Sequence, residues 1–349
     1  MAATHVYVGA AQSMEGAMGG IYRQTVGDGG WQRLTNGLPE DAQVHAITVQ
    51  PDHLETVFIG TTKGAFRSTN HGDRWERLNL PGEPDIWSIA IHPKNPRILY
   101  AGASPPAVYR SDDGGDTWRQ TADPGLPHDR VVMGFACRVM RLDVDPNSPN
   151  DVYATLEANG CMRSRNGGDS WEDCTADLIR FCEQPKYKSR IGSQTEIEGM
   201  LDGHALTCSA AASGTVFLAN RMGLFRSNDK GQTWQDMEIN RFSPLTYGRD
   251  IRVSPHDPKV LYACLSPAAR STDGSIYRSE DVGQTWKRFD HDIKAEATMM
   301  AVTVHPKDPN QVYGVSRFGQ VFATQDGGRS WSETRLPEGA RDVYAGACG

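Results

Sequence analysis

Residues 68–75 read Ser68-Thr69-Asn70-His71-Gly72-Asp73-Arg74-Trp75, and this octapeptide decides the fold because its pattern recurs along the chain. The pattern has Ser or Thr first, Asp or Asn third, Gly fifth and Trp eighth. Five further copies follow in order, at Ser111–Trp118, Ser164–Trp171, Ser227–Trp234, Ser279–Trp286 and Thr324–Trp331. A degenerate copy precedes them at Thr25–Trp31. Such self-similarity indicates a repeat fold with units of about 50 residues.

The chemistry of the octapeptide predicts a β-turn between two strands. Short strand-like runs such as Phe66-Arg67-Ser68 precede the copies, and polar–apolar runs such as Trp75–Leu78 follow them. The Asp or Asn side chain can accept hydrogen bonds from backbone N–H groups of the turn, and Gly provides a positive φ. We expect each Trp to bury its ring between neighbouring units.

A second hairpin precedes most copies and completes the repeat. Its turn carries two prolines, as in His92-Pro93-Lys94-Asn95-Pro96 and His305–Pro309, between an apolar strand and a β-branched or aromatic strand. Each unit therefore has four strands, which is the size of a propeller blade. We predict an all-β fold, a single seven-bladed β-propeller domain over residues 1–349.

The two ends of the chain predict how the ring closes. The run His5–Gly9 matches the second strand of a blade, and Asp342–Gly346 matches the first strand, as in Val44–Thr48. The last strand should therefore complete the first blade, which removes an exposed sheet edge.

Composition narrows the functional classes. The formal net charge is −7, so the basic footprint of a nucleic-acid-binding protein is absent. The start of the chain does not resemble a signal peptide, and no apolar run approaches membrane-spanning length. The seven cysteines include no Cys-x-x-Cys pair, which favours free thiols in a reducing compartment. We therefore expect a cytoplasmic protein without a membrane or nucleic-acid partner.

The octapeptides resemble the Asp-box (BNR) repeats of sialidases and other glycoside-hydrolase propellers. Similar repeats occur in sortilin-like receptors and in photosystem II assembly factors. The resemblance covers nearly the whole chain and implies the propeller fold. It does not imply sialidase activity, because the Phe-Arg-Ile-Pro sequence of sialidases is absent from this chain and their Tyr–Glu pair cannot be assigned. Function must come from a site on the fold.

Loop lengths predict where such a site lies. In a four-stranded blade, the loops between blades share one face of the ring with the loops that join the second and third strands, and both surround the channel. The long loops on this face are 120–141, 172–204, 237–250 and 263–275. Residues 172–204 form the largest, an inter-blade insertion that we expect over the channel face. We interpret these loops as a partial lid, although tolerated insertions are the alternative.

Arginines cluster where chains converge on the channel. They are Arg138, Arg141, Arg221, Arg249, Arg252, Arg317 and Arg341. Guanidinium groups around one pore repel one another unless an anion lies among them, which indicates a carboxylate, sulfate or phosphate ligand. The alternative is pairing with local acids, for which Glu157, Asp250 and Asp342 are the candidates.

Histidines and carboxylates are the candidates for proton transfer. His45 and His204 begin strands at the channel, and His128 lies in a long loop. Glu157, Glu196, Glu198 and Asp250 are the possible carboxylate partners. No His-x-His or His-Glu-x-x-His spacing indicates a metal, although a divalent ion in the channel is possible.

Two further residue types have competing interpretations. Trp87 begins a strand outside the octapeptide pattern and could stack on a sugar or be buried. The cysteines between residues 137 and 208 favour core positions over a zinc site or a thiolate nucleophile.

These features favour a hydrolase or lyase that acts on a small anionic or carbohydrate-like molecule at the channel. Arg138, Arg141, Arg221, Arg249, Arg317 and Arg341, with Trp87, would bind the substrate. His45 or His204 with Glu157 or Asp250 would transfer the proton. The alternatives are a scaffold or adaptor that binds a protein or peptide, and a sugar-binding module. No motif implies an organic cofactor.

Overall fold

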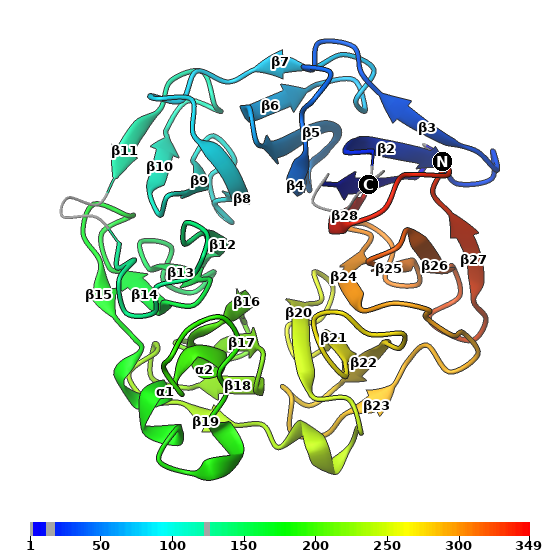
Figure 1. The fold of residues 1–349 in the computed structure, drawn as a ribbon. Helices are drawn as coiled ribbons and strands as arrows, with labels where there is room; N and C mark the ends of the chain where they lie inside the picture. Colours follow the sequence, from blue (N-terminus) through cyan, green and yellow to red (C-terminus); the bar gives the residue numbers. More distant parts are fainter. Residues whose placement is uncertain (1–2, 12–17, 122–125) are drawn as a thin grey trace.

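The structure, a computed structural model, describes residues 3–11, 18–121 and 126–349. In these ranges the backbone forms seven four-stranded antiparallel sheets, arranged as blades around a central channel (Figure 1). The predicted seven-bladed propeller is therefore confirmed. No helix in the described part of the chain is long and apolar enough to span a bilayer.

Each blade uses four strands, with the first strand nearest the channel. Blade 1 contains β28 (Val343–Cys348), β1 (His5–Ala10), β2 (Gly20–Thr25) and β3 (Trp31–Leu34). Blade 2 contains β4 (Val44–Gln50), β5 (His53–Thr61), β6 (Gly64–Ser68) and β7 (Glu76–Arg77). Blade 3 contains β8 (Asp85–Ile91), β9 (Leu99–Ser104), β10 (Val108–Ser111) and β11 (Arg119–Thr121).

The other four blades follow in chain order. Blade 4 contains β12 (Val139–Val144), β13 (Val152–Leu156), β14 (Gly160–Ser164) and β15 (Glu172–Asp173). Blade 5 contains β16 (Gly203–Cys208), β17 (Val216–Asn220), β18 (Gly223–Ser227) and β19 (Gln235–Asp236). Blade 6 contains β20 (Tyr247–Val253), β21 (Leu261–Ser266), β22 (Ser275–Ser279) and β23 (Lys287–Arg288). Blade 7 contains β24 (Met299–Val304), β25 (Val312–Ser316), β26 (Gln320–Thr324) and β27 (Ser332–Arg335).

The ring closes through blade 1, as the sequence predicts. The last strand, β28, pairs antiparallel with β1, with Val8 opposite Gly346. Beyond this ladder, His5 and Gly349 exchange backbone hydrogen bonds of 2.7 and 3.0 Å. Both termini therefore lie in the same blade (Figure 1).

The octapeptide forms a tight hydrogen-bonded turn. Ser68 Oγ donates to Asn70 Oδ1 at 2.8 Å and accepts from the Gly72 N–H at 2.8 Å, and Asn70 Oδ1 also accepts from the Arg74 N–H at 3.0 Å. Gly72 has a φ of 90°, and a Cβ atom there would lie 2.6 Å from a Leu34 methyl carbon. Only glycine fits this position.

The octapeptide tryptophan joins neighbouring blades. Trp75 is buried in a cluster that contains Leu34 of blade 1 and Phe66 of blade 2. Arg67, which precedes the turn, donates to the Gly114 carbonyl oxygen in blade 3 at 3.0 Å. Arg23, Arg110 and Arg226 make the equivalent hydrogen bond to a backbone carbonyl oxygen of the next blade.

The insertion between blades 4 and 5 is partly helical. It contains α1 (Ala176–Phe181), the 3₁₀-helix η1 (Pro185–Tyr187) and α2 (Glu198–Leu201). Leu178 and Tyr187 pack against Phe225 of blade 5 in one apolar cluster. Another 3₁₀-helix, η2 (Ile239–Arg241), lies in the loop that follows blade 5. A lid over the channel stays a prediction, and residues 122–125 of the expected loop 120–141 lie outside the described residues.

Candidate functional site at the channel mouth

The blade geometry brings loop residues to the start of the inner strands. Glu157, Arg221 and Arg317 each follow the second strand of a blade. Their N–H groups donate to the carbonyl oxygens of Arg138, Asp202 and Thr298, at 3.0, 3.3 and 2.8 Å. The residues that precede and follow these strands are therefore neighbours at one face of the ring.

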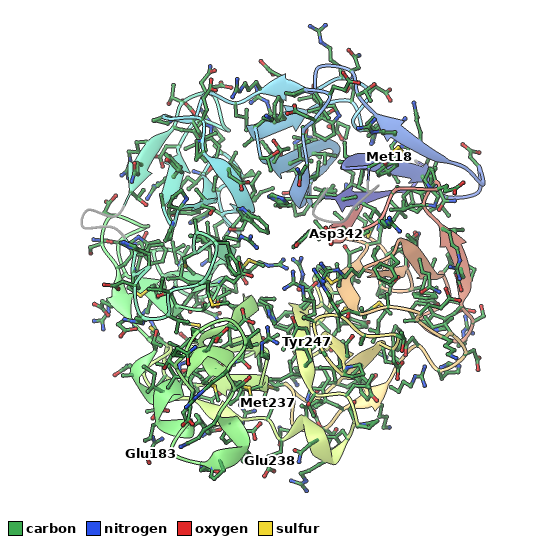
Figure 2. All side chains as sticks on the ribbon, viewed as in Figure 1. Met18, Glu183, Met237, Glu238, Tyr247 and Asp342 are labelled. Atoms are coloured by element: carbon green, nitrogen blue, oxygen red, sulfur yellow. The ribbon has the colours of Figure 1, made fainter. Side chains whose placement is uncertain are left out.

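The channel itself is narrow. Its cavity is about 50 Å³ and is lined by inner-strand residues that include His45, Arg141, His204, Arg249 and Tyr344. A cavity of this size holds a few water molecules. Figure 2 shows nitrogen atoms gathered at the centre of the ring, near the labelled Tyr247.

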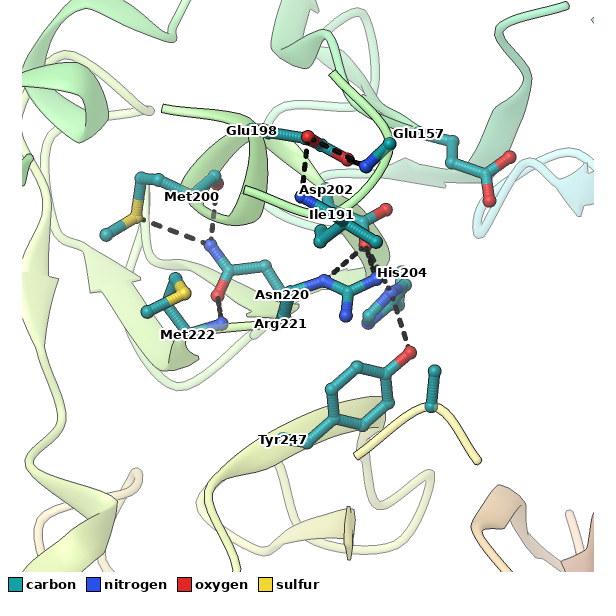
Figure 3. A network of polar contacts seen from close by, with 12 residues as sticks. Glu157, Ile191, Glu198, Met200, Asp202, His204, Asn220, Arg221, Met222 and Tyr247 are labelled. Atoms are coloured by element: carbon teal, nitrogen blue, oxygen red, sulfur yellow. Dashed lines mark hydrogen bonds and ion pairs between the residues drawn. The ribbon is translucent and has the colours of Figure 1, made fainter. Parts of the chain in front are cut away.

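A hydrogen-bonded cluster lies at this mouth between blades 5 and 6 (Figure 3). Asp202 follows α2, and its Oδ2 atom lies 3.0 Å from Arg221 Nη2 and 3.4 Å from His204 Nε2. Tyr247 places its hydroxyl 3.1 Å from the same His204 nitrogen. The other ring nitrogen, Nδ1, donates to the Gly248 carbonyl oxygen at 2.7 Å, which orients the imidazole.

The contacts to the Asp202 carboxylate are one-sided. Every side-chain contact to it among the described residues uses Oδ2. Burial opposes ionisation, but His204, Arg221 and Arg249 outweigh it and lower the Asp202 pKa to about 2. Asp202 is therefore an ionised carboxylate at neutral pH, with Oδ1 available for a water molecule or a hydroxyl group.

Glu157 has the opposite electrostatic behaviour and interacts with this cluster through the charges of Asp202 and Arg221. Burial raises its pKa to about 7, assisted by the negative charge of Asp202 and opposed by Arg138. Arg138 Nη1 lies 3.0 Å from Glu157 Oε2, yet that oxygen is buried and makes no hydrogen bond of acceptable geometry. A carboxyl group with a pKa near 7 can act as a general acid at neutral pH.

Arg249 is the candidate anion ligand. It lines the channel cavity, and no hydrogen bond or ion pair to it occurs among the described residues. Its guanidinium carbon lies 5.8 Å from the centroid of the Tyr344 ring. Burial lowers its pKa, but Tyr247, Tyr344, Glu157 and Asp202 reverse that effect and raise it.

The other predicted anion ligands are largely neutralised within the protein. Arg141 Nη2 and Arg252 Nε lie 3.0 and 3.2 Å from the fully buried Asp250 carboxylate. Arg317 Nη2 lies 2.8 Å from Asp342 Oδ1. Pairing with local acids, the alternative to an anion site, is therefore found for these arginines and for Arg138. Arg341 lies on the exposed surface just before β28.

Trp87 lies in an internal stack. The His45 ring stacks on it with the centroids 3.7 Å apart, and the Arg138 guanidinium carbon lies 4.0 Å from the same centroid. Two groups this close must cover opposite faces of the ring. Trp87 is buried, which fits the other interpretation, although it also lines the channel cavity, and its stacking on a sugar stays a prediction.

His45 and Asp250, two of the predicted catalytic residues, have partners outside the cluster around His204. His45 Nδ1 lies 3.1 Å from Asp85 Oδ1. Asp250 also accepts hydrogen bonds from the N–H groups of Ile251 and Val302. Both residues hold neighbouring strands in place.

The remaining candidates lie away from this cluster. Glu198 accepts hydrogen bonds from the N–H groups of residues 191–193, and Glu196 forms surface ion pairs with Lys188 and Arg190. His128 is exposed. The seven cysteines are buried and free. No group of three or more potential metal ligands occurs among the residues that the structure describes.

Sequence reasoning did not single out Asp202 and Tyr247. The available signal for Asp202 was its position two residues before His204, at the end of an acidic stretch. Tyr247 precedes the noted Arg249 by two residues at the start of β20, and a β-bulge between Gly248 and Asp250 interrupts the alternation of side chains there.

Comparisons with known proteins agree with this architecture. The family described as "Sortilin, neurotensin receptor 3" (Sortilin-Vps10) matches residues 274–345. The xyloglucanase Xgh74A of Acetivibrio thermocellus is 24% identical over 325 residues, which covers 78% of this chain and 36% of the relative. The chain thus spans little more than a third of that enzyme.

Solved structures extend the likeness. The GH74 xyloglucanase from Xanthomonas campestris aligns with a TM-score of 0.64 and 18% identity, over 89% of this chain and 47% of that one. YCF48 bound to D1 peptide aligns with a TM-score of 0.54 and 15% identity, over 84% and 81%. These likenesses show the fold of this chain, a seven-bladed propeller. Relatives of this propeller include carbohydrate hydrolases, at low identity.

Proposed function

We propose that this propeller hydrolyses a glycosidic bond in an acidic carbohydrate at the channel mouth between blades 4, 5 and 6. The observation that carries the proposal is a pair of carboxyl groups whose charges interact and whose pKa values are shifted in opposite directions, about 7 for Glu157 and about 2 for Asp202. Such a pair suits the acid and base roles of glycoside hydrolysis. The xyloglucanase relatives support a carbohydrate as the substrate class.

Each residue of the cluster has a distinct part in the proposed reaction. Protonated Glu157 donates to the glycosidic oxygen, and ionised Asp202 accepts a proton from the attacking water through Oδ1. His204 and Arg221 hold Asp202 through Oδ2, and Tyr247 fixes His204. His45 and Asp250 take no part in this reaction, because their partners lie outside the cluster.

The charge balance supports an acidic substrate. The cationic side chains of this region are Arg138, Arg141, Arg221, Arg249 and Arg252, and the acidic ones are Glu157, Asp202, Asp250 and Asp143, which interacts with Arg141 and Arg252. A carboxylate on the sugar would meet the unpaired guanidinium of Arg249 and form a charge-assisted hydrogen bond there.

Hydrolysis of α- and β-linked 4-nitrophenyl glucuronides and galacturonides tests the proposal. We expect Glu157→Gln to lower kcat about 10²- to 10⁴-fold, the usual contribution of a general acid. Activity should fall above pH 7 because Glu157 loses its proton there. Arg249→Ala should raise KM for the uronides but not for the matching neutral glucosides.

Surface variants of the insertion provide the controls. Glu196→Gln and Arg190→Ala alter exposed charges that take no part in the cluster, so they should leave the rates unchanged. Turnover that survives in Glu157→Gln would refute the assignment of the acid.

A peptide-binding scaffold is the second candidate. The observation that favours it is the alignment with YCF48 bound to D1 peptide, which covers 81% of that chain, against 47% of the xyloglucanase from Xanthomonas campestris. Binding of a library of unstructured peptides, measured with and without saturating uronide, separates the two functions. A peptide bound with micromolar affinity, together with no turnover of any glycoside, would favour the scaffold.

A further inference from the structure

An apolar groove opens beside Glu157. Its volume is about 230 Å³, and its walls come from Pro106 in the β9–β10 loop, the loop segment Val131–Cys137 before β12, and Glu157 with Asn159 in the β13–β14 loop. The Val132 and Phe135 side chains are 73% and 41% exposed. Large apolar side chains that gather at a cavity mark a binding surface.

The groove is built from anchored segments. The Arg130 N–H donates to Asn159 Oδ1 at 3.0 Å, and its guanidinium donates to Thr175 Oγ1 at 2.7 Å and to Asp173 Oδ1 at 3.0 Å. At the other end, Ser104 Oγ donates to the Cys137 carbonyl oxygen at 3.1 Å. The wall that carries Val132 and Phe135 is thus held at both ends.

Glu157, Asn159 and His128 form the polar part of the groove wall. Glu157 is the acidic residue among them, and its Oε2 atom lies 3.0 Å from Arg138 Nη1 without a hydrogen bond of acceptable geometry. A bound molecule with an apolar group along the groove and a polar group at Glu157 would fit both the apolar walls and this polar part.

We propose that this groove binds an aromatic aglycone, so that the substrates are aryl glycosides whose glycosidic oxygen lies at Glu157. This inference rests on the proposed function. The groove is larger than the cavity of roughly 150 Å³ that accommodates benzene in another protein, which leaves room for one substituted ring. Phe135, whose ring centroid also lies 4.6 Å from the Arg138 guanidinium carbon, and Val132 would contact that ring.

The bond changes balance without a further reactant. The Glu157 carboxyl group gives its proton to the glycosidic oxygen, and the bond from the anomeric carbon to that oxygen breaks. Water adds to the anomeric carbon and passes a proton to Asp202. The products are the free sugar and a phenol, and the proton on Asp202 returns to Glu157 through solvent.

The test compares the kcat/KM of each variant with that of the wild type on the same substrate. The intrinsic difference in reactivity between aryl and alkyl leaving groups then cancels from the comparison. The substrates are the 4-nitrophenyl and methyl glycosides of the same uronic acid. We expect Phe135→Ala and Val132→Asp each to lower kcat/KM for the aryl glycoside about tenfold, and to leave the methyl glycoside unchanged. Phe318→Ala is the matched control, since Phe318 is 49% exposed in the β25–β26 loop of blade 7.

Binding to Glu157→Gln provides a readout without turnover. By calorimetry, this variant should bind the aryl glycoside about tenfold more tightly than the methyl glycoside, and Phe135→Ala in the same background should abolish the difference. Equal affinities, or equal effects of Phe135→Ala and Phe318→Ala, would overturn the groove assignment. If the affinity difference is present but wild-type protein cleaves neither glycoside, the groove stands and the hydrolase proposal fails.

Discussion

Replacing Asp250 by Asn separates a structural role from a catalytic one. The Asp250 side chain is fully buried and accepts four hydrogen bonds. Oδ1 receives Arg141 Nη2 and the Ile251 N–H, and Oδ2 receives Arg252 Nε and the Val302 N–H. These bonds join the inner strands of blades 4, 6 and 7. Because an amide group must replace one oxygen by a donor, Asp250→Asn breaks two of the four bonds in either orientation.

The size of the destabilisation follows from the charged groups that lose their partner. Two arginines lose the carboxylate that neutralises them, and burial and Arg252 already lower the pKa of Arg141 to about 10. Breaking one side of a buried ion pair costs about 3–5 kcal/mol. That is a large part of the roughly 5–15 kcal/mol by which folded proteins are stable. We therefore expect Asp250→Asn to be strongly destabilised.

Urea unfolding followed by tryptophan fluorescence measures this loss, and the same variant is then assayed for uronide binding while folded. Asp292→Asn is the control, because Asp292 is 71% exposed. We expect a lower midpoint for Asp250→Asn, no shift for Asp292→Asn, and near-normal ligand affinity in both. Ordinary surface substitutions change the free energy of unfolding by less than about 1 kcal/mol. A change of that size for Asp250→Asn, together with lost turnover, would refute this reasoning and make Asp250 catalytic.

Three further predictions concern the scaffold. Ser227→Ala leaves the buried Gly231 N–H without its 2.7 Å acceptor and should cost about 1–3 kcal/mol in urea unfolding, whereas exposed Ser213→Ala should cost nothing measurable. Removal of residues 343–349 takes β28 from β1, and should yield a protein that is rapidly proteolysed. The depressed pKa of Asp202 stabilises the fold above about pH 3.8, and this contribution is lost as the pH falls towards 2. The free energy of unfolding of Asp202→Asn should therefore depend less on pH between these values than that of the wild type.

The repeat made the fold predictable, because each octapeptide carries its own turn chemistry. Ser68, Asn70 and Gly72 satisfy one another within a few residues, so local sequence suffices. Ring closure was predictable for a related reason. The run that forms β1 and the run that forms β28 each match a different strand of the same repeat.

The site was only partly predictable, because ion pairing depends on distances between blades. Arg221 and Arg317 occupy equivalent places in their repeats. Arg221 pairs with Asp202, which precedes the first strand of its own blade, whereas Arg317 pairs with Asp342, which precedes the first strand of the next one. Two arginines at equivalent positions of the repeat thus take their ion-pair partners from different blades. The same limitation affected Trp87, since nothing in the sequence places His45 and Arg138 on its two faces.

The distribution of side chains around the ring explains why the chemistry is one-sided. The residue that follows the second strand of a blade is, in blade order, Ala11, Thr62, Pro105, Glu157, Arg221, Pro267 and Arg317. Ionisable groups thus occur in blades 4, 5 and 7, and Arg317 is neutralised by Asp342. The insertion between blades 4 and 5 ends at Asp202 and supplies the missing carboxylate beside Glu157 and Arg221. Because closure takes place in blade 1, substitutions at this cluster should change binding or turnover without weakening the strand pairing that holds the ring shut.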